Sequence, residues 1–337
     1  MIDDLQMHET LSQKGYEYKE FLGKGGFSSV LLCHNKKYQH SFAIKKAIKH
    51  KLSMEEYNHL INLNHPNIIK LYDTFEDESS KYLVMEYCSN GTIKDKGNLP
   101  YEKFIYYAKQ ILNAIAFCHS NNIAHRDIKP ENIFLDQYDH AKLADFGMAK
   151  HFQFDGKSNE KCGSLMFLAP EMLQCQEICP FKADIWALGI TFFFMATGQY
   201  PFHASTREEL AQMIFRGEIN YNSYPLNPKI RFLLKKMTSK NQENRPTAEK
   251  LLELPMFSSE NSKLPILPRD KSSTHLLNLS NYRTQSKVNL TESTNEIITP
   301  KQKDTAKSNL SLNAYRTIIL RPGIRNAKTH FLQSKTF

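Results

Sequence analysis

The chain has 337 residues, of which 41% are hydrophobic and 23% charged, as in a soluble globular protein with room for more than one compact lobe. No transmembrane segment is expected, because the most apolar stretch, residues 186–197, is too short to cross a bilayer. The first ten residues are acidic and lack an apolar centre, so they do not read as a secretory signal.

The net charge of +9 comes from one end of the chain. Residues 261–337 contain 13 Lys and Arg against 4 Asp and Glu, and the charges of the other residues cancel. Ser, Thr, Asn and Lys dominate this tail, and its apolar residues are too sparse for a core, so it is predicted to be mainly disordered. It could tether the chain to anionic partners, but its dispersed charges favour a solvated linker, and no specific nucleic acid is expected.

The cysteines indicate reduced thiols in an intracellular, cytoplasmic protein, with the nucleus left open. Six cysteines are present, and none forms a C-x-x-C pair. Cys175 and Cys179 could share a helix face, but no histidine or second pair completes a zinc site.

The first hundred residues show mainly strand patterns. Strands are predicted at residues 16–22, 30–33, 41–45, 68–75 and 82–87, with one helix at residues 53–64. Later residues are mostly helical, with helices predicted at residues 101–119, 184–197, 229–238 and 247–254. This order predicts a small sheet lobe followed by a larger helical lobe.

Most of the chemical information lies in two motifs. They are His125-Arg126-Asp127-Ile128-Lys129-Pro130-Glu131-Asn132 and, a little later, Asp145-Phe146-Gly147. Phosphoryl transfer from ATP to a hydroxyl needs a carboxylate to orient the hydroxyl, a cation for the γ-phosphate and oxygen ligands for Mg²⁺. The two motifs supply all of these groups.

These residues resemble the eukaryotic protein kinase family, and Cys162-Gly163-Ser164 resembles its calmodulin-dependent and AMP-activated group. Ala169-Pro170-Glu171, Asp184 and Arg245 extend the resemblance over residues 16–257. It implies an α+β, two-lobed protein kinase fold. A small β-rich N-lobe with one helix would cover about residues 16–87, a larger helical C-lobe about residues 88–257, and the disordered C-terminal tail residues 261–337.

The resemblance also implies roles for individual residues. Asp127 would orient the substrate hydroxyl and accept its proton, while Lys129 would steady the γ-phosphate and indicates serine/threonine specificity. Asn132 and Asp145 would hold Mg²⁺. Lys45 would contact the phosphates of ATP and pair with Glu56, which fits the family spacing better than Glu55.

The remaining ATP contacts are implied in the same way. The glycine-rich turn comprises Gly23, Lys24, Gly25, Gly26 and Phe27, with Ser28 where the family has a third glycine. Val30, Ala43, Met85 and Phe134 would line the adenine pocket, and the backbone from Glu86 to Cys88 would hydrogen-bond adenine. Thr92 stands where many basophilic kinases carry glutamate, so a preference for arginine in the substrate is left open.

The sequence therefore predicts a serine/threonine protein kinase that uses ATP and Mg²⁺ and acts on protein substrates. A pseudokinase scaffold is the main alternative. Pseudokinases usually lack one of four chemical residues of the family, whereas this chain has all four, namely Lys45, Asp127, Asn132 and Asp145. A small-molecule kinase is disfavoured by the Ala169-Pro170-Glu171 closure of a peptide-binding shelf. Glu160, where the related group has an activating threonine, is either a permanent negative charge opposite Arg126 or a solvated loop residue.

Overall fold

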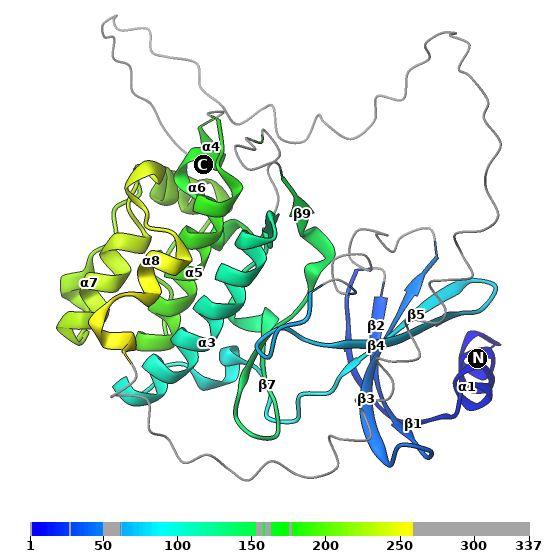
Figure 1. The fold of residues 1–337 in the computed structure, drawn as a ribbon. Coiled ribbons are helices and arrows are strands. Elements are labelled where there is room, and N and C mark those ends of the chain that lie inside the picture. The colour runs from blue at the N-terminus through cyan, green and yellow to red at the C-terminus, as the bar shows by residue number, and fades with distance from the viewer. Residues whose placement is uncertain are drawn as a thin grey trace, which may run out of the picture. The chain divides into compact units, whose positions relative to one another are not determined.

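The computed structural model describes residues 2–26, 28–49, 61, 63–152, 158, 163–174 and 177–258, without the side chains of residues 2–4. Within this part a sheet lobe precedes a helical lobe, as Figure 1 shows. The α+β, two-lobed architecture predicted from the sequence is therefore present. The helix predicted for residues 53–64 and the tail of residues 261–337 lie almost wholly or wholly outside the described residues.

The N-lobe contains a five-stranded sheet in the order β1-β2-β3-β5-β4, with all neighbours antiparallel. The strands are β1 (Tyr16–Lys24), β2 (Ser28–Asn35), β3 (His40–Ile48), β4 (Leu71–Glu76) and β5 (Ser80–Glu86). The strand predicted for residues 68–75 begins only at Leu71. The preceding residues pair elsewhere, because Ile68 forms a bridge with Leu143 and the Ile69 N–H donates to the Leu143 carbonyl at 2.8 Å.

The sheet buries both of its faces, since alternate residues of a strand point to opposite sides. One face contributes Leu83 to the main core, and the other contributes Tyr82 and Val84 to a second core. The second core is rich in stacked aromatic rings, for example Phe75 against Tyr82 at 4.8 Å between centroids. A lobe with two cores holds its strand register firmly, because a shift by one residue would exchange the faces.

A helix that the sequence patterns did not predict, α1 (Ile2–Gln13), contributes to the second core. Met7 and Leu11 of α1 are buried there, and His8 packs edge-on against Tyr18 of β1. Figure 1 shows α1 beside the sheet. Among the side chains of α1 that the structure describes, these two are the buried apolar ones, which is too weak a pattern to stand out in the sequence.

The C-lobe is built around α5 (Pro180–Thr197). This helix begins with Pro180, where proline is favourable at the first position, and ends at Gly198, which has a left-handed φ of 71°. The other helices are α3 (Tyr101–Ser120), α4 (Pro170–Leu173), α6 (Arg207–Arg216), α7 (Pro228–Met237) and α8 (Ala248–Leu252). Helix α6 was not predicted, because Ile214 is its one fully buried residue.

Short elements carry the candidate site. They are β6 (Ile123–Ala124), β7 (Ile133–Leu135), β8 (Ala141–Leu143) and β9 (Lys150–His151), with 3-10 turns η1 (Ile93–Lys96), η2 (Pro130–Asn132), η3 (Phe146–Met148) and η4 (Leu165–Phe167). In the part of the chain that the structure describes, no helix combines the length and hydrophobicity needed to cross a membrane.

Candidate active site

The register of β2, β3 and β5 gathers the predicted ATP contacts on one face of the sheet. Val30 lies opposite Lys45, and Ala43 lies opposite Met85. Directly opposed residues of antiparallel strands share a face, as do residues two apart in one strand. Val30, Ala43, Lys45 and Met85 therefore point to the same side, which is the side of Leu83 and the main core.

The turn between β1 and β2 is tight at Gly25. Its N–H donates to the Ser28 carbonyl at 2.7 Å, and a Cβ placed on Gly25 would lie only 2.9 Å from Ser28 Oγ. A Cβ on Gly23 or Gly26 would meet no atom of another residue within 4 Å. A Cβ at Gly25 would thus push the Ser28 hydroxyl aside, while Gly23 and Gly26 leave backbone uncovered where a phosphate could approach.

Lys45 and Asp145 meet between the two lobes. Lys45 Nζ lies 3.3 Å from Asp145 Oδ1, and 48% of the Asp145 side chain is exposed. Burial by itself raises the pKa of Asp145, but the charge and hydrogen bond of Lys45 hold it below the ordinary value. Asp145 has a φ of 61°, a strained conformation for a residue other than glycine. The result is an ionised, partly open carboxylate beside a cation.

Asp127 is the centre of a second hydrogen-bonded group. Its Oδ2 lies 2.5 Å from Lys129 Nζ and accepts from Asn132 Nδ2 at 3.0 Å. The same amide nitrogen donates to the Asp127 backbone carbonyl at 2.8 Å. Three of the predicted chemical residues therefore lie together in one loop, with the aspartate almost buried.

Ser164, which with Lys129 was a ground for predicting serine/threonine specificity, completes this group. Its backbone N–H lies 3.3 Å from Asp127 Oδ1, and its hydroxyl lies 3.2 Å from both Asp127 Oδ1 and Lys129 Nζ. The sequence feature that could have indicated this contact is the position of Ser164 directly after Gly163. Gly163 has a φ of 103°, and a Cβ there would lie 2.8 Å from the Arg126 carbonyl oxygen, so glycine lets the chain approach the loop closely.

The loop that contains Asp127 is positioned by Asp184 of α5. The Asp184 carboxylate accepts from the backbone N–H groups of His125 and Arg126, each at 2.8 Å, and lies 3.0 Å from His119 Nε2. Arg126 has a left-handed φ of 69°. The two backbone hydrogen bonds fix this strained turn and so set the direction of Asp127.

His125 links the loop to the Asp145 segment. Its Nε2 lies 3.0 Å from the Ala144 carbonyl, its Nδ1 accepts from the Asp127 N–H at 3.3 Å, and its ring meets Phe146 edge-on at 4.8 Å. Burial lowers the pKa of His125. A neutral ring with its proton on Nε2 satisfies both contacts, so the histidine has a structural part in the site.

The segment predicted to hydrogen-bond adenine begins at Glu86. The Glu86 carboxylate is engaged with Lys142 Nζ at 2.6 Å and accepts from the Lys70 N–H at 3.2 Å. This leaves the backbone as the means by which the segment could bind a base. Cys88 is half-buried, and burial raises the pKa of its thiol, so it is not a reactive thiolate. Phe134, on β7, bridges to Thr92.

A buried ion pair fixes the segment that follows Ser164. Arg245 donates to Glu171 through two nitrogens, at 2.6 and 2.7 Å, and also to the Ser239 carbonyl at 2.8 Å. Its guanidinium lies 5.0 Å from the Trp186 ring. The ion pair anchors α4 to the helical core.

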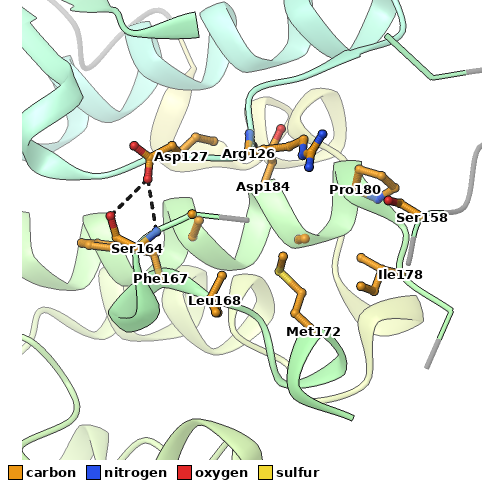
Figure 2. Close-up of a pocket in the computed structure, with 14 residues that line it drawn as sticks. Arg126, Asp127, Ser158, Ser164, Phe167, Leu168, Met172, Ile178, Pro180 and Asp184 are labelled. Atoms are coloured by element: carbon orange, nitrogen blue, oxygen red, sulfur yellow. Dashed lines mark hydrogen bonds between the residues drawn. The ribbon is translucent and has the colours of Figure 1, made fainter. Parts of the chain in front are cut away.

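A small apolar cavity lies between the Asp127 loop and α4. Figure 2 shows Asp127 and Ser164 at one side of it and Met172 and Ile178 at the other. Its volume is about 30 Å³, enough for a water-sized group but not for a substrate.

The protein kinase domain family matches residues 16–257. This chain belongs to that family. Among its relatives, calcium-dependent protein kinase 6 of Plasmodium berghei (strain Anka) is 37% identical over 300 residues, covering 82% of this chain and 20% of that protein. CBL-interacting serine/threonine-protein kinase 15 of Arabidopsis thaliana is 32% identical over 256 residues, covering 72% of this chain and 61% of the relative.

Sperm motility kinase 1 of Mus musculus is also similar, with 33% identity over 258 residues, covering 74% of this chain and 53% of the relative. The aligned parts amount to between a fifth and about three fifths of these curated relatives. The similarity agrees with the kinase group that the Cys162-Gly163-Ser164 pattern resembled.

Several predicted residues lie outside the described part of the chain: Phe27, Glu56, Glu160 and Cys162. The Lys45–Glu56 pair and the proposed charge at Glu160 therefore stay predictions. Asp127, Lys129 and Asn132 are in direct contact, and Lys45 meets Asp145.

Proposed function

We propose that this chain transfers the γ-phosphoryl group of ATP to serine and threonine hydroxyls of protein substrates. The observation that carries the proposal is the group around Asp127, whose carboxylate is bound by Lys129, Asn132 and Ser164 at 2.5 to 3.3 Å. A carboxylate fixed in this way can orient an incoming hydroxyl and accept its proton. The reaction needs little base strength, so positioning is the main contribution.

Lys129 and Lys45 supply positive charge on two sides of the site. Lys129 contacts Asp127 itself, and we assign it to the γ-phosphoryl oxygens. Lys45 projects from the sheet face that also carries Val30 and Ala43, and we assign it to the remaining phosphates. Fixed cations stabilise the transition state because they need not reorganise as charge moves.

The residues present also fit Mg²⁺, which prefers hard oxygen ligands and takes one or two carboxylates together with substrate phosphates. Asp145 is ionised and partly open, and the Asn132 amide nitrogen is engaged with Asp127, which leaves the amide oxygen for a cation. Bound Mg²⁺ would neutralise phosphate charge.

The experiment uses the purified full chain with ATP, Mg²⁺ and a generic protein substrate. We expect phosphoserine and phosphothreonine in the product. Asp127→Ala should reduce the rate by roughly 10²–10⁴-fold, because a positioned base contributes about that much. Lys45→Met should also remove activity, whereas Lys46→Met, which makes the same charge change on the other face of β3, should not.

Circular dichroism would show that each variant is folded. A loss of less than about tenfold in Asp127→Ala would be too small for the proposed role. Nucleotide binding without any transfer by the wild-type chain would instead support a pseudokinase scaffold. A product that contains mainly phosphotyrosine would overturn the substrate class.

A further inference from the structure

The side chain of Lys94, on η1, lies among two aromatic rings and a carboxylate. Its Nζ is 4.9 Å from the Phe194 ring centroid and 4.5 Å from that of Tyr200. It donates to Tyr200 Oη at 2.7 Å and lies 3.3 Å from Glu131 Oε1. Aromatic faces and carboxylates both attract cations, and here they surround one ammonium group. We call Glu131, Phe194 and Tyr200 the cation cage.

Lys94 is placed in the cage by the turn that carries it. Thr92 and Asp95 form a capping box, in which the Thr92 N–H and hydroxyl donate to Asp95 Oδ2 at 2.8 and 2.9 Å. Ile93 is fully buried. Gly97 lies so close to α5 that a Cβ there would be 2.9 Å from the Gly198 Cα. The backbone on both sides of Lys94 is therefore fixed against the C-lobe.

The cage borders the place where a substrate hydroxyl would meet Asp127. Glu131 belongs to the same loop as Asp127, one residue before Asn132. Tyr200 packs edge-on against Phe167 of η4, at 5.7 Å between ring centroids. The same turn, η4, starts directly after Ser164, which contacts Asp127. When the hydroxyl of a substrate lies at Asp127, the peptide residues next to that hydroxyl-bearing residue would therefore lie beside the cation cage.

Of the two oxygens of the Glu131 carboxylate, Oε1 has partners among the described residues and Oε2 has none. Its Oε1 meets Lys94 and lies 3.5 Å from Tyr200 Oη, whereas Oε2 is buried and has no hydrogen-bond partner among the described residues. A buried carboxylate oxygen without a donor is costly and can accept another hydrogen bond. Burial by itself lowers the pKa of Lys94, but Tyr200 and Glu131 raise this pKa above its ordinary value. Lys94 therefore stays a cation.

We propose that Lys94 is a built-in occupant of a substrate-selecting cation site, and that it prevents the site from selecting arginine or lysine beside the phosphorylated residue. This inference rests on the proposed function for the identity of the bound segment. A substrate cation would have to displace Lys94 from two rings and from the Oε1 atom of Glu131, which Lys94 already contacts. Without Lys94, the same three groups would be free to bind that cation.

A purely structural role for Lys94 makes a different prediction. The Lys94 and Glu131 side chains are 40% and 43% exposed, and ion pairs with such exposure contribute little to stability. A structural pair would change thermal stability when broken, and would leave the choice among peptides unchanged. Peptide preference is therefore the deciding measurement.

The experiment compares serine peptides that differ only by arginine, alanine or glutamate at each position near the serine. For each enzyme we would measure kcat/KM ratios, and also the direct binding of the same peptides by fluorescence anisotropy. The wild-type chain should show no preference for arginine. Lys94→Ala should favour arginine over alanine by roughly tenfold at one or two positions, the size expected for one cation with a carboxylate and aromatic rings.

Two further variants control the result. Lys96→Ala removes an equal charge from the same exposed turn without touching the cage, so its preference should match the wild type. Lys94→Ala combined with Glu131→Gln should lose the gained preference for arginine. Because ratios are taken within one enzyme, a general loss of activity does not imitate the effect.

Two outcomes would overturn the inference. One is a wild-type chain that already selects arginine as strongly as Lys94→Ala does. The other is a Lys94→Ala variant with the wild-type profile in both kcat/KM and binding. If no peptide is phosphorylated by any variant, the proposed function fails, while the binding measurement still decides whether Lys94 closes the cage.

Discussion

The Asp184 carboxylate accepts the backbone N–H of Arg126 at 2.8 Å, in a turn where Arg126 has a left-handed φ of 69°. A second backbone N–H, from His125, reaches the same carboxylate. The aspartate is nearly inaccessible to water. One side chain of α5 thus maintains the backbone conformation that directs Asp127.

Replacing this carboxylate should affect both folding and activity. In Asp184→Asn the amide nitrogen would face a backbone N–H, which leaves at least one buried donor unpaired. We expect a loss of about 2–4 kcal/mol in the free energy of unfolding, measured by urea denaturation. We also expect a fall in kcat of at least about tenfold, because small misplacements of reacting groups are costly. Wild-type kcat in a folded Asp184→Asn variant would contradict this role.

Removing one partner of the Arg245–Glu171 pair should destabilise the protein strongly. Arg245→Met would leave Glu171 buried and unpaired, at a cost of about 3–5 kcal/mol in urea denaturation. Arg245→Lys should also be destabilising, since an ammonium cannot reproduce the two-pronged contact and the bonds to backbone carbonyls.

The double variant Arg245→Met with Glu171→Leu supplies the control. It removes both charges together, so it should recover part of the stability lost in the single variant. A single variant that loses less than about 1 kcal/mol would show that the pair does not anchor this segment.

Gly189 is required where α5 and α7 approach each other. A Cβ at this position would lie 2.6 Å from Thr238 Cγ2 and 3.0 Å from Met237 Cβ. Alanine is favoured over glycine in a helix by about 1 kcal/mol, but overpacking typically costs about 1–3 kcal/mol. Gly189→Ala should therefore lower the midpoint of urea unfolding, and adding Thr238→Ser, which removes the nearest methyl group, should restore part of it. A rise in the midpoint would show that the helices separate without cost.

Asp77 should make the hairpin between β4 and β5 sensitive to acid. Its carboxylate accepts from Tyr82 Oη at 2.7 Å and from the Ser80 and Ser79 N–H groups at 2.7 and 2.9 Å. Burial alone raises the pKa of Asp77, but these hydrogen bonds bring it below the ordinary 3.8. A lowered pKa means that the stabilisation is complete well above that value and is lost as the pH falls through the folded-state pKa.

The comparison is with Asp77→Asn, which does not titrate. At pH 7 we expect the variant to be less stable by about 1 kcal/mol in urea denaturation. The difference should shrink as the pH is lowered below the ordinary value of 3.8. If the wild type and Asp77→Asn differ in the free energy of unfolding by the same amount at pH 7 and at low pH, the charge of Asp77 does not contribute to stability.

The sequence predicted the two-lobed architecture because its signals are local. Alternating apolar residues mark the strands, and continuous apolar residues mark α5. Helix α1 was missed since, among its described side chains, only Met7 and Leu11 reach the core, and α6 was missed since only Ile214 is fully buried. The beginning of β4 was placed too early, because Ile68 and Ile69 pair with Leu143, far along the chain.

The chemical groups of the candidate site could be predicted from local motifs, because Lys45, Asp127, Lys129, Asn132 and Asp145 stand in an order that is read directly along the chain. How these groups are held depends on the tertiary structure. Ser164 reaches Asp127, and Lys94 enters the cation cage, through packing between segments distant in sequence. Such contacts depend on helix placement and on left-handed turns such as that of Arg126, and local residue preferences do not specify either.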